Sequence, residues 1–303
     1  MLDPQSLVTL EPGLPDLGTP VLVSALEGFV DAGSALRLVR EHLVSTSEPR
    51  LVASFDADQL VDYRARRPLL RFDRDHWASL ALPRIDVHAL TDRSGQAYLL
   101  MTGPEPDVQW QRFAAAVELL VRELRVRLVV GLDAVPLAVP HTRPLGLTAH
   151  ASRPELVAGH QAWFDEALVP GSVGHAVEYL LARAGHDTAG FAVHVPQYLA
   201  QAEYPQAALR LVEALGEAPG LSLDVEALEV AAQVVAVKVQ SEASESAEIG
   251  EMIAGLEQQY DAFVAARADS ALLAEGRLPS ADELGSEFER FLAEQTGKES
   301  GEG

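Results

Sequence analysis

The apolar positions of this chain change their spacing near residue 31, and that change predicts a strand followed by a helix. Residues 21–26 form a nearly continuous apolar run, which is typical of a strand buried on both faces of an α/β sheet. After Asp31 the apolar residues follow the spacing of one helix face, as Leu36, Val39 and Leu43 do. We therefore expect a strand, a loop and a helix in that order.

The same alternation of short apolar runs and longer amphipathic stretches continues along the chain. It predicts further strands at 51–55, 85–91, 96–101, 127–132, 145–150 and 191–195, and helices at 110–124, 172–185 and 206–215. The turn Asp92-Arg93-Ser94-Gly95 joins two of these strands as a β-hairpin. This order indicates an α/β fold with a mixed sheet.

Prolines and glycines divide the chain into candidate regions. Residues 1–19 have no sustained period and are interpreted as an irregular lead-in, and the α/β domain is expected at 20–220. From Gly131 we expect irregular structure as far as the next strand, because the prolines that follow exclude a helix. Residues 221–295 predict an acidic helical region, within which 234–239 also fits a strand. We expect the last segment, 296–303, to be disordered.

Composition removes several classes of function. The chain has 303 residues, of which 48% are hydrophobic, and no apolar run approaches the roughly 20 residues that cross a bilayer. The N-terminus lacks a signal-like segment, so we expect a cytoplasmic protein that does not bind membranes. The absence of cysteine excludes disulfides, thiol nucleophiles and cysteine-ligated zinc.

The net charge of −22 argues against nucleic acid as a partner, since binding to phosphates relies on an excess of Lys and Arg. The acidity is concentrated near the C-terminus. Residues 221–303 contain 18 Asp and Glu against 5 Lys and Arg, a net charge of −13, which leaves −9 for the first 220 residues.

The loop after the first strand is the first candidate site, because α/β folds bind ligands beyond the carboxyl ends of their strands. Its candidate residues are Glu27, Gly28, Asp31 and Gly33. The glycine spacing is not that of a dinucleotide-binding or P-loop motif, and two carboxylates at a helix start would repel phosphate. Asp31 has two interpretations: it caps the helix or forms the turn, or it joins Glu27 in an acid/base or hydrogen-bonding role.

A second group of polar residues forms the other candidate site. It contains Asp133, His141, Thr142, Arg143 and His150. A histidine beside an aspartate can act as a general base, and arginine can hold a carboxylate or a phosphate. The alternative is structural: these side chains bond loop carbonyls or cross a subunit interface. The nine histidines lack metal-ligand spacing, and 170–174 lacks the glycine spacing of a hydrolase nucleophile. We therefore expect no metal and no cofactor.

Several segments together resemble the PAC2 (proteasome assembly chaperone 2) family in its actinobacterial form. They are EGFVDAG at 27–33, FDADQLVDYRARRP at 55–68, TGPEPDVQW at 102–110, GLDAVPLAVPHTRP at 131–144 and HVPQYLAQAEYPQAA at 194–208. The resemblance implies a three-layer α/β core with a mixed, mostly parallel sheet, similar to the phosphorylase/hydrolase-like fold, and a C-terminal helical region. It also implies homo-oligomers, of which a trimer is one form, and no established catalytic residues.

Some relatives in that family dock on proteasome rings through a C-terminal tail of hydrophobic residue, Tyr and any residue. The sequence ends Gly301-Glu302-Gly303, so docking by such a tail is not expected. The sequence thus predicts a non-enzymatic, oligomeric protein-binding or chaperone-like protein, with proteasome subunits as candidate partners. The alternative is a small-molecule protein, a binder or enzyme for nucleoside-like compounds, whose site combines residues 27–33 with 133–143.

Overall fold

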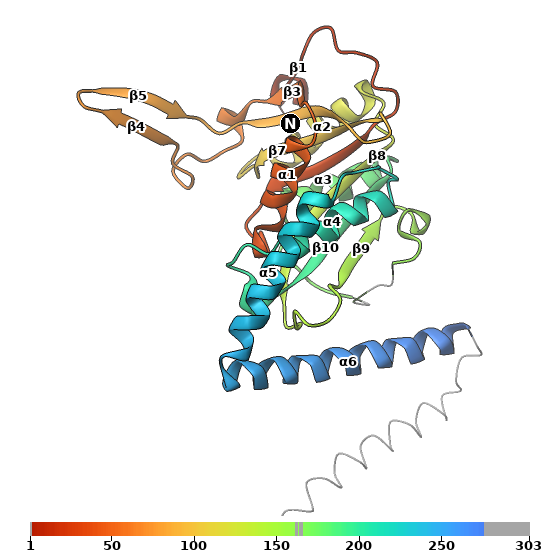
Figure 1. The fold of residues 1–303 in the computed structure, drawn as a ribbon. Coiled ribbons are helices and arrows are strands. Elements are labelled where there is room, and N and C mark those ends of the chain that lie inside the picture. The colour runs from red at the N-terminus through yellow and green to blue at the C-terminus, as the bar shows by residue number, and fades with distance from the viewer. Residues whose placement is uncertain (1, 161–162, 164–165, 276–303) are drawn as a thin grey trace, which may run out of the picture. The chain divides into compact units, whose positions relative to one another are not determined.

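A computed structural model describes residues 2–160, 163 and 166–275, in which an eight-stranded sheet forms the centre of the protein (Figure 1). In spatial order its strands are β1 (Val8–Leu10), β3 (Arg50–Phe55), β6 (Ile85–Thr91), β7 (Ala97–Pro104), β2 (Val21–Glu27), β8 (Leu128–Leu137), β10 (Thr188–Pro196) and β9 (Leu147–Ala151). The helices are α1 (Ala35–Ser45), α2 (Trp110–Glu123), α3 (Val173–Arg183), α4 (Pro205–Glu217), α5 (Glu226–Ser244) and α6 (Ala247–Glu275).

The sheet is mixed, and most of its strands run in one direction. Strands β7, β2, β8 and β10 are mutually parallel neighbours, whereas β6 and β9 are antiparallel to the strands beside them. Since β3 is antiparallel to β6, it points the same way as the parallel centre. The predicted mixed and mostly parallel α/β sheet is confirmed.

Helices cover both faces of this sheet and complete three layers. Along β2, Val21 and Val23 pack in a core with the helices α1 and α4, while Leu22 packs with α2 and α3 on the other face. All three side chains are fully buried. A strand in this position must be apolar at successive positions, which explains why 21–26 shows no alternation with polar residues.

Strand β8 is longer than its sequence indicates. We expected irregular structure from Gly131, yet the strand continues through Pro136 to Leu137. Strand β2 pairs with β8 only as far as Gly131, so the second half of β8 has a partner on one side, β10. A strand edge without a partner tolerates the missing N–H of proline, and the prediction of irregular structure was wrong for this reason.

One element was not predicted, a separate two-stranded antiparallel sheet formed by β4 (Leu69–Asp73) and β5 (His76–Ala81). We call it the β4–β5 hairpin. Figure 1 shows it extending away from the eight-stranded sheet. Every residue of both strands is exposed, so the hairpin forms without a core of its own.

The chain divides into two compact units, residues 1–247 and 248–303. The first includes α5, whose Leu228 joins the same buried core as Leu215 of α4, and residues 234–239 are helical. The second contains most of α6, which lies within the helical region predicted at 221–295. The part of that region beyond residue 275 and the predicted tail lie outside the described residues. Within the described part of the chain, no helix combines the length and the apolar character needed to cross a membrane.

Candidate functional site

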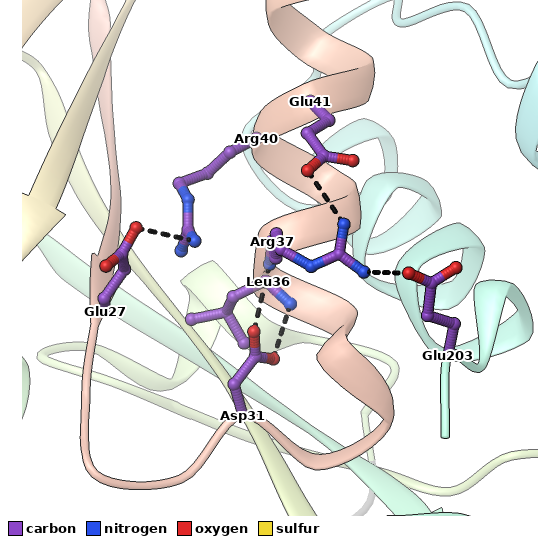
Figure 2. A network of polar contacts seen from close by, with 7 residues as sticks. All are labelled: Glu27, Asp31, Leu36, Arg37, Arg40, Glu41 and Glu203. Atoms are coloured by element: carbon purple, nitrogen blue, oxygen red, sulfur yellow. Dashed lines mark hydrogen bonds and ion pairs between the residues drawn. The ribbon is translucent and has the colours of Figure 1, made fainter. Parts of the chain in front are cut away.

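The loop between β2 and α1 is held by contacts of its own acidic residues (Figure 2). Asp31 accepts hydrogen bonds from the backbone N–H groups of Leu36 at 2.8 Å and Arg37 at 3.1 Å. These are orphan donors of the first turn of α1, and a carboxylate there also complements the positive end of the helix dipole. The geometry supports the helix-capping interpretation of Asp31.

The neighbouring charges in this loop are paired with one another. Glu27 accepts a hydrogen bond from Arg40 of α1 at 3.1 Å. Arg37 in turn bridges Glu41 at 2.8 Å and Glu203 at 2.5 Å (Figure 2). The pair of Glu27 and Arg40 thus ties the loop to α1, and the pair of Arg37 and Glu203 ties α1 to a distant segment of the chain.

Gly33 occupies a position that only glycine fits. Its φ is +68°, and an added Cβ would lie 2.9 Å from Cβ of Tyr204. Its backbone N–H donates to the carbonyl of Ala200, and its carbonyl accepts from the N–H of Tyr204, both at 2.8 Å. The glycine therefore allows two distant segments of the chain to meet at close range.

A small pocket of about 30 Å³ lies at the carboxyl ends of β2 and β7, beside the middle of β8 and the start of α3. We call it the acidic pocket, after its carboxylates Glu105, Asp133 and Glu178. The other lining residues are Ser24, Leu26, Gly28, Val30, Leu36, Gly131, Leu132, Ser172, Val173 and Gly174. This is the edge of an α/β sheet at which ligands commonly bind.

Glu105 and Ser172 tie the pocket to the start of α3. Glu105, which is buried, accepts a hydrogen bond from the N–H of Val173 at 2.5 Å. Ser172 is the N-cap and accepts from the N–H of His175 at 3.1 Å. The first turn of α3 is thus satisfied by side chains, and a carboxylate stabilises its positive end.

Two carboxylate–histidine pairs stand beside one another at the pocket. Asp133 and His175 are 3.2 Å apart, Glu178 and His150 are 2.7 Å apart, and the two imidazole rings are 6.2 Å apart. The hydrogen bond with Asp133 raises the pKa of His175, and that with Glu178 raises the pKa of His150, each against the effect of burial. Both histidines therefore hold protons at a higher pH than a free imidazole.

Glu178 has capacity for one more hydrogen-bond donor. The residue is 6% exposed, its Oε2 contacts His150, and its Oε1 is buried without a hydrogen-bond partner among the described residues. An added Cβ on Gly131 would lie 1.9 Å from that Oε1, so the absence of a side chain there makes room for the carboxylate. Buried polar atoms are rarely left unsatisfied, and this one lies at the pocket wall.

The structure brings two of the seven sequence candidates together, since Gly28 and Asp133 both line the acidic pocket. Glu27, Asp31 and Gly33 make the contacts described above. His141 donates its backbone N–H to the hydroxyl of Tyr198 at 2.8 Å, and its ring also contacts that hydroxyl. Arg143 is half-buried and engaged in a contact of its own. A joint site of 27–33 with 133–143 stays a prediction.

The sequence did not indicate Glu105 and Glu178, which line the pocket, or His175, which pairs with Asp133 beside it. Glu105 follows β7, whereas His175 and Glu178 both belong to α3, and the three are joined to their partners across 68, 42 and 28 positions of the chain. One signal was available: Glu105 directly follows a strand that ends at the same edge as β2, where carboxyl ends of parallel strands meet.

The fold and the pocket define a class, a three-layer α/β protein with a polar pocket at the carboxyl ends of its parallel strands. Within this class the chain belongs to the PAC2 family, whose sequence profile matches residues 25–243. The search of curated proteins found no relative of this chain.

Solved structures show the same fold. A protein of unknown function from Mycobacterium tuberculosis, Rv2714, is 44% identical, with a TM-score of 0.82, over 88% of this chain and 92% of that one. The M. tuberculosis proteasome-assembly chaperone homologue Rv2125 is 24% identical, with a TM-score of 0.70, over 77% and 99%. The Pyrococcus furiosus archaeal proteasome activator PbaB is 14% identical, with a TM-score of 0.59, over 78% and 98%.

Proposed function

We propose that this chain is a non-enzymatic, self-associating protein-binding member of the PAC2 family that acts as an assembly chaperone in the cytoplasm. Membership in the family supports a protein partner, because relatives of the same fold are named as a proteasome-assembly chaperone homologue and a proteasome activator. The observation that carries the proposal is the β4–β5 hairpin.

The hairpin exposes large apolar side chains. They are Leu69, Leu70, Phe72, Trp77 and Leu80, with Leu82 just beyond the second strand. Leu69 is 81% exposed and Trp77 is 65% exposed, and the rings of Phe72 and Trp77 pack edge to face with their centroids 5.1 Å apart. An isolated two-stranded hairpin is marginally stable in water, and a clustered apolar surface marks a binding site. The hairpin therefore gains stability when a protein surface covers it.

A second copy of this chain is the occupant that the charges favour. Residues 69–82 contain two arginines and two aspartates besides one histidine, so the hairpin is close to neutral in a chain of net charge −22. Contact through the hairpin avoids the repulsion that two acidic surfaces would suffer. Each hairpin strand also has one edge without a strand partner in the described chain, which is a template for further pairing.

The molar mass in solution tests self-association. We expect light scattering after size exclusion to give a multiple of 32.5 kDa for the full chain. The double substitution Phe72→Ser with Trp77→Ser removes the exposed ring pair, and we expect it to give the mass of a single chain. Phe29→Ser is the matched control, because Phe29 is also 65% exposed but lies in the 27–33 loop. A single-chain mass for the unaltered protein would contradict the proposal.

The assembly role needs a separate measurement. Tagged full-length protein is incubated with purified proteasome subunits, before and after they assemble into core particles, and the retained subunits are identified by mass. We expect retention of the unaltered protein on subunits or precursors. No retention on either form would refute the proteasome version while leaving self-association intact.

A further inference from the structure

We propose that the acidic pocket is a binding site for a primary ammonium group. This inference is independent of the proposed assembly function, because it concerns residues at the sheet edge and not the β4–β5 hairpin. Three features of the pocket carry it: the sign of its charges, the unsatisfied oxygen of Glu178 and its size.

The charges at the pocket favour a cation. Among the described residues that line it, carboxylates come from Glu105, Asp133 and Glu178, and neither Lys nor Arg is present. With His150 and His175 both protonated, the five groups sum to −1, and with both neutral they sum to −3. A positively charged ligand group is thus attracted in every protonation state of the histidines.

The hydrogen-bonding groups at the pocket favour a donor. Glu105 has one oxygen on the N–H of Val173 and its other oxygen directed toward Gly28, whose added Cβ would lie 3.6 Å away. Glu178 has its buried Oε1 without a partner among the described residues. An ionised carboxylate only accepts hydrogen bonds, so a ligand group with N–H donors satisfies its remaining oxygen. Leaving such an oxygen unsatisfied in a buried place is costly, which gives the binding its driving force.

The pocket's size and its ligand set decide between kinds of cation. Its volume is about 30 Å³, where one water molecule needs roughly 10–15 Å³ on a comparable measure. An ammonium with a short stem fits this space, whereas tetramethylammonium is too large and donates no hydrogen bond. Among the described residues, no group of His, Asp and Glu is arranged to hold a metal ion. A primary ammonium group is therefore the cation that satisfies charge, donors and volume together.

The two histidines provide a direct readout. Each imidazole is bonded to a pocket carboxylate, and the charged groups that face the pair are Asp133, Glu178 and Glu105 together with the histidines themselves. A bound ammonium adds positive charge beside the rings, which lowers the pKa of both. Reciprocally, loss of the histidine protons makes the pocket more negative, so we expect the affinity for the ammonium group to increase as the pH rises through the raised pKa values of the two histidines.

The test follows the imidazole resonances of His150 and His175 by NMR in the full chain while methylammonium chloride is added at constant ionic strength. Single substitutions to Gln assign the two rings. We expect a saturable shift with methylammonium and none with tetramethylammonium. A shift that does not saturate, or that tetramethylammonium reproduces, would overturn the assignment. A parallel titration uses lysine amide whose α-amine is blocked, so that the side chain carries its one ammonium group. Comparison with methylammonium shows whether the pocket prefers a lysine side chain or a small free amine.

Two variants localise the binding. Gly28→Ala narrows the pocket, because its Cβ would lie 3.6 Å from Oε2 of Glu105, an ordinary contact distance. The backbone at Gly28 is not in the left-handed region that favours glycine, so we expect the variant to fold. Glu178→Gln keeps the shape of the side chain and removes its charge. For Glu178→Gln we expect the dissociation constant for methylammonium to rise by about tenfold or more, as for loss of a hydrogen bond to a charged group. For Gly28→Ala we also expect a rise, because the added methyl group occupies part of the space beside Glu105.

Each variant has a control that leaves the pocket alone. Gly250→Ala adds a methyl group with no atom within 4 Å, and Glu155→Gln neutralises an exposed carboxylate on Arg153. Neither is expected to change the affinity. Unchanged binding in Gly28→Ala would overturn the inference even if Glu178→Gln failed to fold.

Discussion

The protein contains two β-hairpins that follow one another in the chain and have opposite surroundings. The hairpin of β6 and β7 lies inside the eight-stranded sheet, and Val87, Leu99 and Met101 on its strands are fully buried. The β4–β5 hairpin pairs through the same kind of antiparallel ladder, but all its residues are exposed. Local pairing is common to both, so the stability of each depends on what covers it.

The difference shows that apolar side chains have a different role in each hairpin. In β7 the apolar side chains are satisfied by the helices on both faces of the sheet, and the contacts are internal to one chain. In β4 and β5 comparable side chains contact little of their own chain. We infer that the first hairpin supports the fold and the second supports association, and substitutions can separate these two roles.

The largest expected effect is the loss of a buried side chain from the covered hairpin. Leu99→Ala removes methyl groups from a fully enclosed site and leaves a cavity, so we expect the free energy of unfolding to fall by about 2–5 kcal/mol. Leu80→Ala in the exposed hairpin should change the free energy of unfolding of the monomer by less than about 0.5 kcal/mol. Urea unfolding at high dilution measures both. A comparable loss for Leu80→Ala would contradict the comparison.

The turns of the two hairpins also differ in how well the rest of the chain holds them. Asp92 accepts hydrogen bonds from the N–H groups of Ser94 and Gln96 at 2.9 Å, and from that of Ser222 at 2.8 Å. We expect Asp92→Ala to reduce the free energy of unfolding by about 1–3 kcal/mol, because three backbone N–H groups lose hydrogen bonds to a charged acceptor. Asp75→Ala in the other turn is the matched control, since the Asp75 side chain is 91% exposed and bonds the exposed ring of His76, and no measurable loss is expected.

Acid should weaken the covered hairpin through the same carboxylate. Burial opposes the ionisation of Asp92, but the hydrogen bonds from Ser94 and Ser222 outweigh it and lower its pKa below the usual value. Its contribution to stability is therefore present above the pKa of the unfolded state and is lost as the pH falls through the lower folded value. Unfolding measured from pH 6 to pH 2 should show a smaller acid loss in Asp92→Asn. An identical pH profile would refute this role.

The smallest expected effect is in the turn of the exposed hairpin. Arg74 has a φ of +54°, a conformation that glycine adopts without steric penalty. We expect Arg74→Gly to favour the hairpin by about 0.5–1 kcal/mol, which population-sensitive NMR shifts of β4 and β5 would report. Arg71→Gly, in a strand instead of the turn, should have the opposite sign.

The sequence predicted the layers and the order of most elements because buried parallel strands and amphipathic helices have distinct periods. Residues 21–26 and 36–43 show this most clearly, and β2 and α1 follow them. The β4–β5 hairpin escaped prediction because neither strand has a buried face, so no alternation of apolar and polar residues develops.

The candidate site was harder to predict than the fold. Asp31 and Gly33 stand where the sequence indicated, and their contacts are those of a helix cap and a close approach of two backbones. The acidic pocket depends on which side chains meet at the sheet edge, and that follows from strand order. Asp133 of β8 pairs with His175 of α3, and the two residues are 42 positions apart in the sequence. No local sequence pattern predicts a contact over that distance.

Hydrogen exchange at two protein concentrations tests the central claim, that the β4–β5 hairpin is an association surface, most directly. In the concentrated sample we expect the amides of β4 and β5 to exchange slowly, because a second copy covers them. On dilution their protection should fall, while that of β6 and β7 stays constant. Rapid exchange of the β4–β5 amides at both concentrations would contradict the account.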